Sequence, residues 1–105
     1  MQEQQFRINE LLLDGRGVVT TTAQSIEDVY STLDFSDIKN NIKTIVVNNL
    51  SSNDIYFSND PLATDLTAGG IIRSGQPREL PIIDFSSVPY FVANAPSNIA
   101  VEVWG

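Results

Sequence analysis

Short hydrophobic segments recur through the second half of the chain, and residues that favour turns (Asn, Asp, Ser, Gly and Pro) separate them. The spacing from one segment to the next is roughly ten residues, which is typical of the strands in an all-β sandwich or small barrel. The hydrophobic segments are residues 45–47, 55–57, 71–72, 80–83, 90–92 and 99–104. We therefore predict an all-β fold, an antiparallel β-sandwich or jelly-roll-like arrangement of about seven or eight short strands.

The strongest strand prediction covers residues 42–50. Residues 45–47 are Ile-Val-Val, a continuous β-branched run that is typical of a central strand buried on both faces. Residues 51–54, Ser-Ser-Asn-Asp, predict a turn after this strand. The next hydrophobic segment, residues 55–58, is then expected to return beside it as its partner strand.

Proline and side-chain alternation shape the predictions for the C-terminal part. Pro81 interrupts residues 79–83, and a proline within a strand favours an edge position or a bulge because it has no N–H to donate. Earlier in the chain, residues 62–70 are predicted to form a longer loop, in which Leu62 and Leu66 are candidate anchors to the core. Residues 99–104 alternate between Ile, Val and Val on one face and Ala, Glu and Trp on the other, which predicts a half-buried strand.

The length of 105 residues corresponds to one β-domain over residues 1–105. Residues 1–5 are polar and are expected to form a flexible N-terminal arm. Asp14-Gly15 lies between two apolar runs, and this dipeptide is a strong hairpin signal. Residues 5–22 are therefore predicted to form a hairpin.

One segment of the N-terminal half has helical rather than strand periodicity. Hydrophobic residues recur at helical spacing over residues 26–33, and Ser25 with Asp28 resembles a capping box. We predict one short helix there, and a bent strand is the alternative. Residues 34–41 are expected to form a loop that crosses between sheets.

The chain is acidic, with 13 acidic and 6 basic residues and a formal net charge of −7. Binding to nucleic acid depends on clustered Lys and Arg, and the basic residues here are scattered, so we expect no nucleic-acid partner. No stretch approaches the roughly 20 apolar residues that span a bilayer, so we expect no membrane partner. An acidic surface could meet a basic patch on a protein partner, or could serve solubility alone.

The residues that carry chemistry form no catalytic pattern. The chain has neither Cys nor His, which removes thiolate metal sites and Ser/His or Cys/His nucleophile systems. A Ser–Lys arrangement would need Lys39 or Lys43 to be buried, and both lie in a polar stretch. The acidic residues offer many chance pairs, and nothing marks one pair as a hydrolytic site. We predict no enzymatic activity, no cofactor and no metal site.

Calcium is the one metal that the loops bring into consideration. Their Asn and Asp side chains carry oxygen atoms of the kind that Ca²⁺ prefers, but their spacing does not match a twelve-residue EF-hand loop. The same residue types favour turns, so turn formation is the main interpretation and a loop calcium site is the alternative. These residues are Asn53, Asp54, Asn59, Asp60 and Asp65.

The segment from Lys43 to Gly105 resembles a module that recurs among the virion proteins of tailed bacteriophages. The resemblance lies in the order of its strands and turns. A strand that ends in Asn-Asn-Leu-Ser-Ser is followed by Ile-Tyr-Phe, a Gly-rich segment, a Glu-Leu-Pro-Ile segment, a Tyr-containing strand and a terminal strand. In this chain they are residues 48–52, 55–57, 69–76, 79–82, 88–93 and 99–105.

The resemblance implies a small jelly-roll-like or immunoglobulin-like sandwich that is bound to a capsid or tail as a decoration, cement or adaptor protein. The expected function is non-enzymatic stabilisation of the head through many small contacts with the major capsid protein or another virion protein. A homo-oligomer such as a trimer is expected, because a small core without disulfides gains from association. The alternative is a carbohydrate- or receptor-binding module of a phage tail or fibre.

Four aromatic residues are the candidate interface residues: Trp104, Tyr90, Tyr56 and Phe6. Trp is enriched at binding hot spots, and Trp104 belongs to the terminal strand, which is often at the edge of a sheet. Aromatic residues on strands also serve as core or cross-strand pairs. A sugar-stacking platform would require the strand aromatics, Phe91 included, to share one exposed face.

Overall fold

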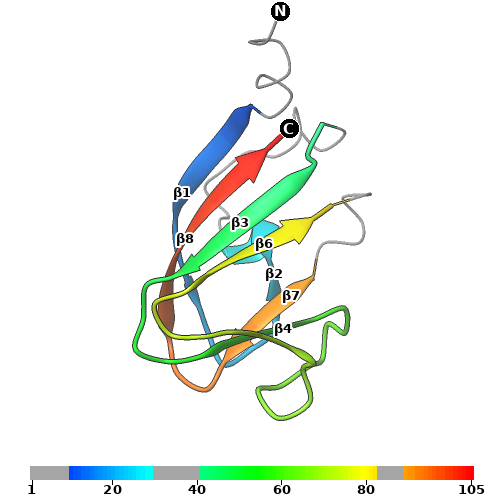
Figure 1. The fold of residues 1–105 in the computed structure, drawn as a ribbon. Coiled ribbons are helices and arrows are strands. Elements are labelled where there is room, and N and C mark those ends of the chain that lie inside the picture. The colour runs from blue at the N-terminus through cyan, green and yellow to red at the C-terminus, as the bar shows by residue number, and fades with distance from the viewer. Residues whose placement is uncertain (1–9, 30–40, 83–88) are drawn as a thin grey trace, which may run out of the picture.

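A computed structural model describes residues 10–29, 41–82 and 89–105 (Figure 1). These residues form eight strands in two antiparallel sheets and one short helix, which confirms the prediction of an all-β sandwich. The predicted N-terminal arm and Phe6 lie outside the described residues. So do the second half of the predicted helix and nearly all of the loop predicted for residues 34–41.

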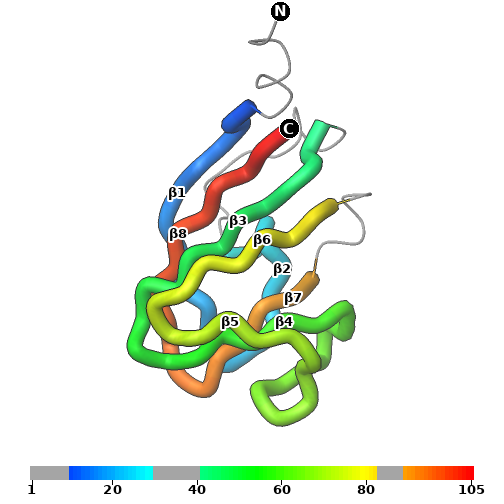
Figure 2. Tube along the Cα trace, in the orientation of Figure 1, coloured from blue at the N-terminus to red at the C-terminus, as the bar shows by residue number. Residues whose placement is uncertain are grey.

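Each sheet contains four strands, and the two sheets pack face to face (Figures 1 and 2). The first sheet has the order β1 (Leu11–Val19), β8 (Ser97–Trp104), β3 (Thr44–Asn49) and β6 (Pro77–Pro81). The second has the order β2 (Gln24–Ser25), β7 (Tyr90–Ala93), β4 (Ile55–Ser58) and β5 (Gly70–Ile72). The helix α2 (Ile26–Val29) follows β2 directly.

The core lies between the sheets and is built by alternation along each strand. On β8 the residues Ile99, Val101 and Val103 are buried, while their neighbours are exposed or half-buried. From the opposite sheet, Phe91 and Ile55 are both fully buried. Each strand therefore contributes one apolar face, which is the pattern that stabilises two packed antiparallel sheets.

The predicted hairpin over residues 5–22 is wrong in the part that the structure describes. β1 runs straight through Asp14-Gly15, and Gly15 and Gly17 pair with Val101 and Ile99 of β8. A hairpin turn of this kind needs a positive φ, and Gly75 is the one described residue that has it. β1 spans nine residues, eight of which pair with β8. This ladder satisfies more backbone groups than a local turn would, so the strand stays extended.

The prediction that residues 55–58 return beside the strand at 42–50 is also wrong. β3 pairs with β6 and β8, whereas β4 pairs with β5 and β7 in the other sheet. The turn at residues 50–54 therefore carries the chain across the sandwich. Val46 on β3 is only half-buried, so this central strand is buried on one face instead of two.

Two further expectations concern strand position and the helix start. The terminal strand β8 lies between β1 and β3, so the expectation that Trp104 is on an edge strand is wrong. Pro81 lies on β6, which is an edge strand, as predicted. The Asp28 N–H donates to Ser25 Oγ at 3.3 Å, and this bond supports the predicted helix start.

The turn between β3 and β4 is organised by a buried asparagine. Asn49 is 1% exposed, and its Nδ2 group donates to the carbonyls of Asn53 at 2.7 Å and Ile72 at 3.0 Å. Its Oδ1 accepts from the N–H and the hydroxyl of Ser51, at 3.0 and 2.7 Å. Since Ile72 belongs to the second sheet, this side chain links the two layers and satisfies its own polar groups.

Candidate binding surfaces

The outward face of the first sheet combines carboxylates with apolar side chains; we call it the outer sheet face. Strand register places Asp14 directly opposite Glu102. On the other side of Glu102 lies Val46, and Glu79 lies opposite Val46 on the edge strand. Carboxylates from three different strands therefore share one row across the sheet.

A hollow of about 370 Å³ lies on this face, lined by Thr44, Val46, Glu79, Glu102 and Trp104. The Trp104 Nε1–H donates to Glu102 Oε1 at 3.1 Å, which fixes the orientation of the indole beside the carboxylate. An indole ring, an aliphatic wall and two carboxylates together suit a Lys or Arg side chain. The aliphatic stem of such a side chain would pack on the apolar wall, and its cationic head would meet the carboxylates and the indole face.

We expect the carboxylate row to lower the stability of the isolated fold. Like charges directly opposite one another on antiparallel strands are destabilising, and Asp14 and Glu102 are such a pair. A basic group bound beside them would relieve this repulsion.

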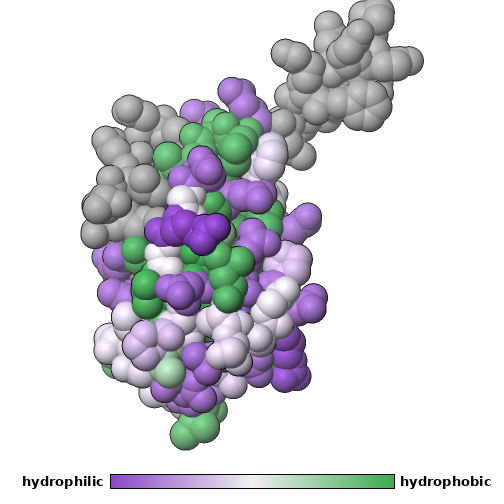
Figure 3. All heavy atoms as spheres, turned by 90° about the vertical axis from the view of Figure 1, so that its left-hand side faces the viewer, coloured by the Kyte–Doolittle hydropathy of each residue, from purple (hydrophilic) through white to green (hydrophobic). Residues whose placement is uncertain are grey.

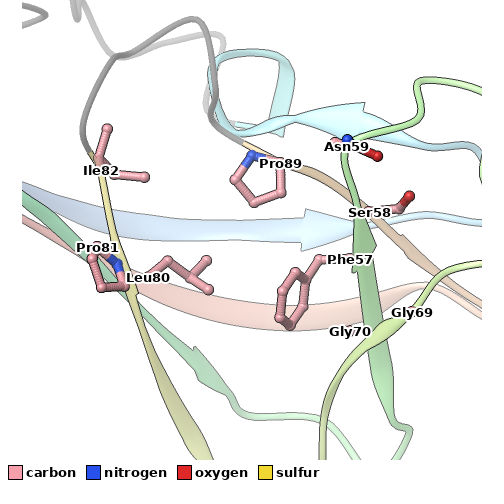
Figure 4. Close-up of a pocket in the computed structure, with 9 residues that line it drawn as sticks. All are labelled: Phe57, Ser58, Asn59, Gly69, Gly70, Leu80, Pro81, Ile82 and Pro89. Carbon is pink, nitrogen blue, oxygen red and sulfur yellow. The ribbon is translucent and has the colours of Figure 1, made fainter.

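A second hollow, of about 470 Å³, opens at the edge of the sandwich between β4 and β6 (Figure 4). Its walls are mostly apolar, and the side chains of Leu80 and Phe57 point toward one another across it. None of the described residues that line this edge cavity carries a titratable group, and their side chains offer mainly apolar contact. The lining residues are Phe57, Ser58, Asn59, Gly69, Gly70, Leu80, Pro81, Ile82 and Pro89.

The Phe57 ring is held by close neighbours. A Cβ built on Gly70 would lie 2.4 Å from the ring, so only a glycine lets β5 approach it this closely. The Arg78 guanidinium lies 5.3 Å from the ring centroid, within the range of a cation–π contact. The edge cavity thus has a fixed aromatic wall with a positive charge beside it.

The loop between β4 and β5, residues 59–69, carries the two most exposed large hydrophobic residues of the described chain. Leu62 is 84% exposed and Leu66 is 88% exposed, so the prediction that they anchor the loop to the core is wrong. The buried residue of this loop is Ala63, at 5%. Figure 3 shows hydrophobic surface projecting at the lower end of the molecule, the end at which Figure 1 places this loop.

The predicted interface residues lie on different faces. Trp104 lies on the outer sheet face. Tyr56 and Tyr90, both half-buried, are diagonal neighbours on the outward face of the second sheet, where Tyr56 pairs with Val92. Phe91 is fully buried in the core. The structure therefore does not bring the aromatic residues into one platform of the kind that sugar stacking would require.

Two of the Asn and Asp side chains that suggested a calcium site accept hydrogen bonds from backbone N–H groups. Asp60 Oδ1 accepts from the N–H of Leu62 at 2.9 Å, and Asp54 Oδ1 accepts from the N–H of Ser74 at 3.1 Å. Within residues 10–29, 41–82 and 89–105, no three acidic side chains are grouped so that they could hold a metal ion. No helix in this part of the chain is long and apolar enough to cross a membrane.

No family model, curated protein or solved structure matches the chain.

Sequence reasoning named Trp104 but missed the carboxylates around it. Glu79 and Glu102 are far apart in the sequence, and only the strand order β8–β3–β6 brings them to one hollow. The alternation of residues 99–104 was visible in the sequence, and it placed Glu102 on the same face as Trp104. No local signal indicated which strands would lie beside it.

Proposed function

We propose that this protein is a non-enzymatic virion structural protein of the capsid-decoration type. It binds a basic surface of the major capsid protein or another virion protein through its outer sheet face. The observation that supports this proposal most is the hollow lined by Trp104, Glu79 and Glu102, which offers an aromatic wall and two carboxylates. The resemblance of residues 43–105 to phage virion proteins supplies the virion context.

The outer sheet face has the composition of a binding hot spot. Trp is among the residues that most often dominate binding energy, and here it lies beside apolar and charged groups that a partner would desolvate together. Complementary charges would also steer the acidic chain toward a basic surface and speed association. Binding should therefore weaken as the salt concentration rises.

Co-sedimentation with phage heads that lack this protein tests the proposal. The wild-type chain should bind the heads, and Trp104→Ala should weaken binding roughly 30-fold, the usual effect of a hot-spot Trp. The charge-reversal pair Glu79→Lys and Glu102→Lys should abolish it. Tyr90→Ala, on the outward face of the other sheet, is the matched control and should bind like wild type.

Two results would count against this function. One is a wild-type chain that fails to bind heads at low salt. The other is Trp104→Ala binding as tightly as wild type while remaining folded by circular dichroism.

A carbohydrate-binding tail module is the second candidate. Since the aromatic residues do not share one platform, a sugar ring would stack on the Trp104 indole alone, beside the carboxylates and the Thr44 hydroxyl. A glycan array separates the two functions. Selective glycan binding that Trp104→Ala removes would favour the sugar reader, and no glycan binding would favour the decoration protein.

A further inference from the structure

The exposed loop is ordered by its own hydrogen bonds. The Thr64 N–H donates to Thr67 Oγ1 at 2.8 Å, and the N–H groups of Thr67 and Ala68 donate to the Thr64 carbonyl at 3.1 and 3.0 Å. Thr64 Oγ1 accepts from the N–H of Leu66 at 3.2 Å. These bonds fix a turn that presents Leu66 outward, so its exposure is a property of a defined conformation.

The edge cavity lies at the base of the same loop. Asn59 and Gly69, the first and last loop residues, both line it, while Leu62 and Leu66 project from the loop into solvent. The chain therefore has an apolar protrusion, formed by Leu62 and Leu66 and called the knob below, beside the edge cavity. Within one chain the knob does not fill this cavity. Two copies related by a two-fold axis can each place the knob in the other copy's edge cavity, so that the same contact forms twice.

Charge favours the same arrangement. Between Lys43 and Arg73 the chain contains no basic residue, and the loop itself carries Asp60 and Asp65. The edge cavity has Arg78 beside it, over the Phe57 ring. An acidic knob thus meets a cavity with a positive rim, whereas a membrane surface with anionic lipids would repel the loop.

We infer that the chain self-associates through this loop: Leu62 and Leu66 of one copy pack into the edge cavity of a second copy, and Asp65 lies toward the second copy's Arg78. This contact uses none of the residues that line the hollow around Trp104, and it does not depend on the proposed function.

Sedimentation velocity and native mass spectrometry on the full chain over a concentration series test the contact. The wild-type chain should shift from one chain mass to two as concentration rises. Leu62→Asn with Leu66→Asn should raise the dimer dissociation constant at least roughly 30-fold, since apolar anchors in a pocket dominate such contacts. The matched control is Leu50→Asn, an exposed leucine outside the loop, which should dimerise like wild type.

Cysteine cross-linking identifies the surfaces, because the chain has no native Cys that could react. Leu66→Cys and Pro81→Cys chains, mixed in oxidised glutathione, should form a mixed disulfide, since their Cα atoms must approach within about 7 Å. Leu66→Cys mixed with Lys43→Cys should not form one.

Three outcomes would overturn the inference: a monomer at every concentration, a three-chain mass, or a dimer that the loop variants leave intact. If the chain is monomeric and its loop variants lose binding to heads, the loop binds a protein of the head instead of a second copy. If the chain is monomeric and binds vesicles through the loop, the loop binds a membrane surface. Loss of head binding by Trp104→Ala with the dimer intact would leave the inference standing and test only the proposed function.

Discussion

Replacing Asn49 tests whether its side chain links the two sheets. Asn49→Ala removes the group that donates to the carbonyls of Asn53 and Ile72 and accepts twice from Ser51. Asn49→Asp keeps nearly the same shape and both acceptor positions for Ser51. It replaces the two donated bonds with a carboxylate oxygen that faces two carbonyls.

The loss of unfolding free energy in Asn49→Ala depends on which of the hydrogen-bonding groups around Asn49 find a new partner. The Ser51 hydroxyl also donates to the Asn53 carbonyl, at 3.0 Å, so these two groups keep one bond after the change to Ala. The Ser51 N–H, at a part-buried site, and the Ile72 carbonyl, at a buried site, each lose a partner. Leaving a buried polar group without a partner costs about 1–3 kcal/mol. We expect Asn49→Ala to lower the free energy of unfolding by about 3 kcal/mol, out of a total on the order of 5–15 kcal/mol. Asn49→Asp should cost at least as much, since it buries an unpaired charge.

Urea unfolding followed by the fluorescence of Trp104, the single tryptophan, measures the effect. The melting temperature of Asn49→Ala should fall by roughly 12 °C, about 4 °C per kcal/mol for a domain of this size. Asn48→Ala is the matched control, because Asn48 is the preceding residue on β3 and is only half-buried. Its cost should stay within about 0.5 kcal/mol. A loss below about 1 kcal/mol in both Asn49 variants would refute the assignment of Asn49 as the link between the sheets.

The other predictions concern the aromatic wall and the carboxylate row. Gly70→Ala should cost about 2–3 kcal/mol in thermal or urea unfolding, because its Cβ would meet the Phe57 ring at 2.4 Å. Gly69→Ala, with nothing within 4 Å of the added Cβ, should be nearly neutral, and equal costs at the two positions would contradict the close packing. Asp14→Asn should raise the free energy of unfolding by a few tenths to about 1 kcal/mol, because it removes the repulsion with Glu102 across the strands. That gain should shrink at 1 M salt, and a gain independent of salt would argue against an electrostatic cause.

The positions of the strands could be predicted from the sequence because the side-chain period is visible locally. Residues 99–104 alternate between apolar and polar or small side chains, and β8 buries the apolar set as expected. Pro81 indicated an edge strand through its missing N–H, and β6 is at the edge. These features depend on single residues and their immediate neighbours, so no knowledge of the partner strand was needed.

Strand pairing could not be predicted, since it depends on contacts between distant segments. Asp14-Gly15 has the chemistry of a turn, but pairing with β8 outweighs that preference. The direction of the chain after Asn49 is set by bonds to Ile72, which lies 23 residues away. Likewise, the loop leucines looked like anchors because hydrophobicity alone predicts burial, and the turn around Thr64 instead orients them outward.

The two proposed contacts would reinforce one another on a lattice. In Figures 1 and 2 the end of β8 that carries Trp104 and the loop between β4 and β5 lie at opposite ends of the sandwich. A pair of chains joined through their loops would carry two outer sheet faces; in each chain Pro81 of the edge cavity lies two strands from Trp104, because both residues pair with Thr44. Once the first face has bound, the second face binds at the effective concentration that the pair sets. The overall affinity of the pair can then exceed the affinity of a single face by a factor of about 100 or more. Loop variants that break the pair should consequently weaken binding to heads even though the hollow around Trp104 is unchanged, while binding of a single face to an isolated capsid subunit should stay the same.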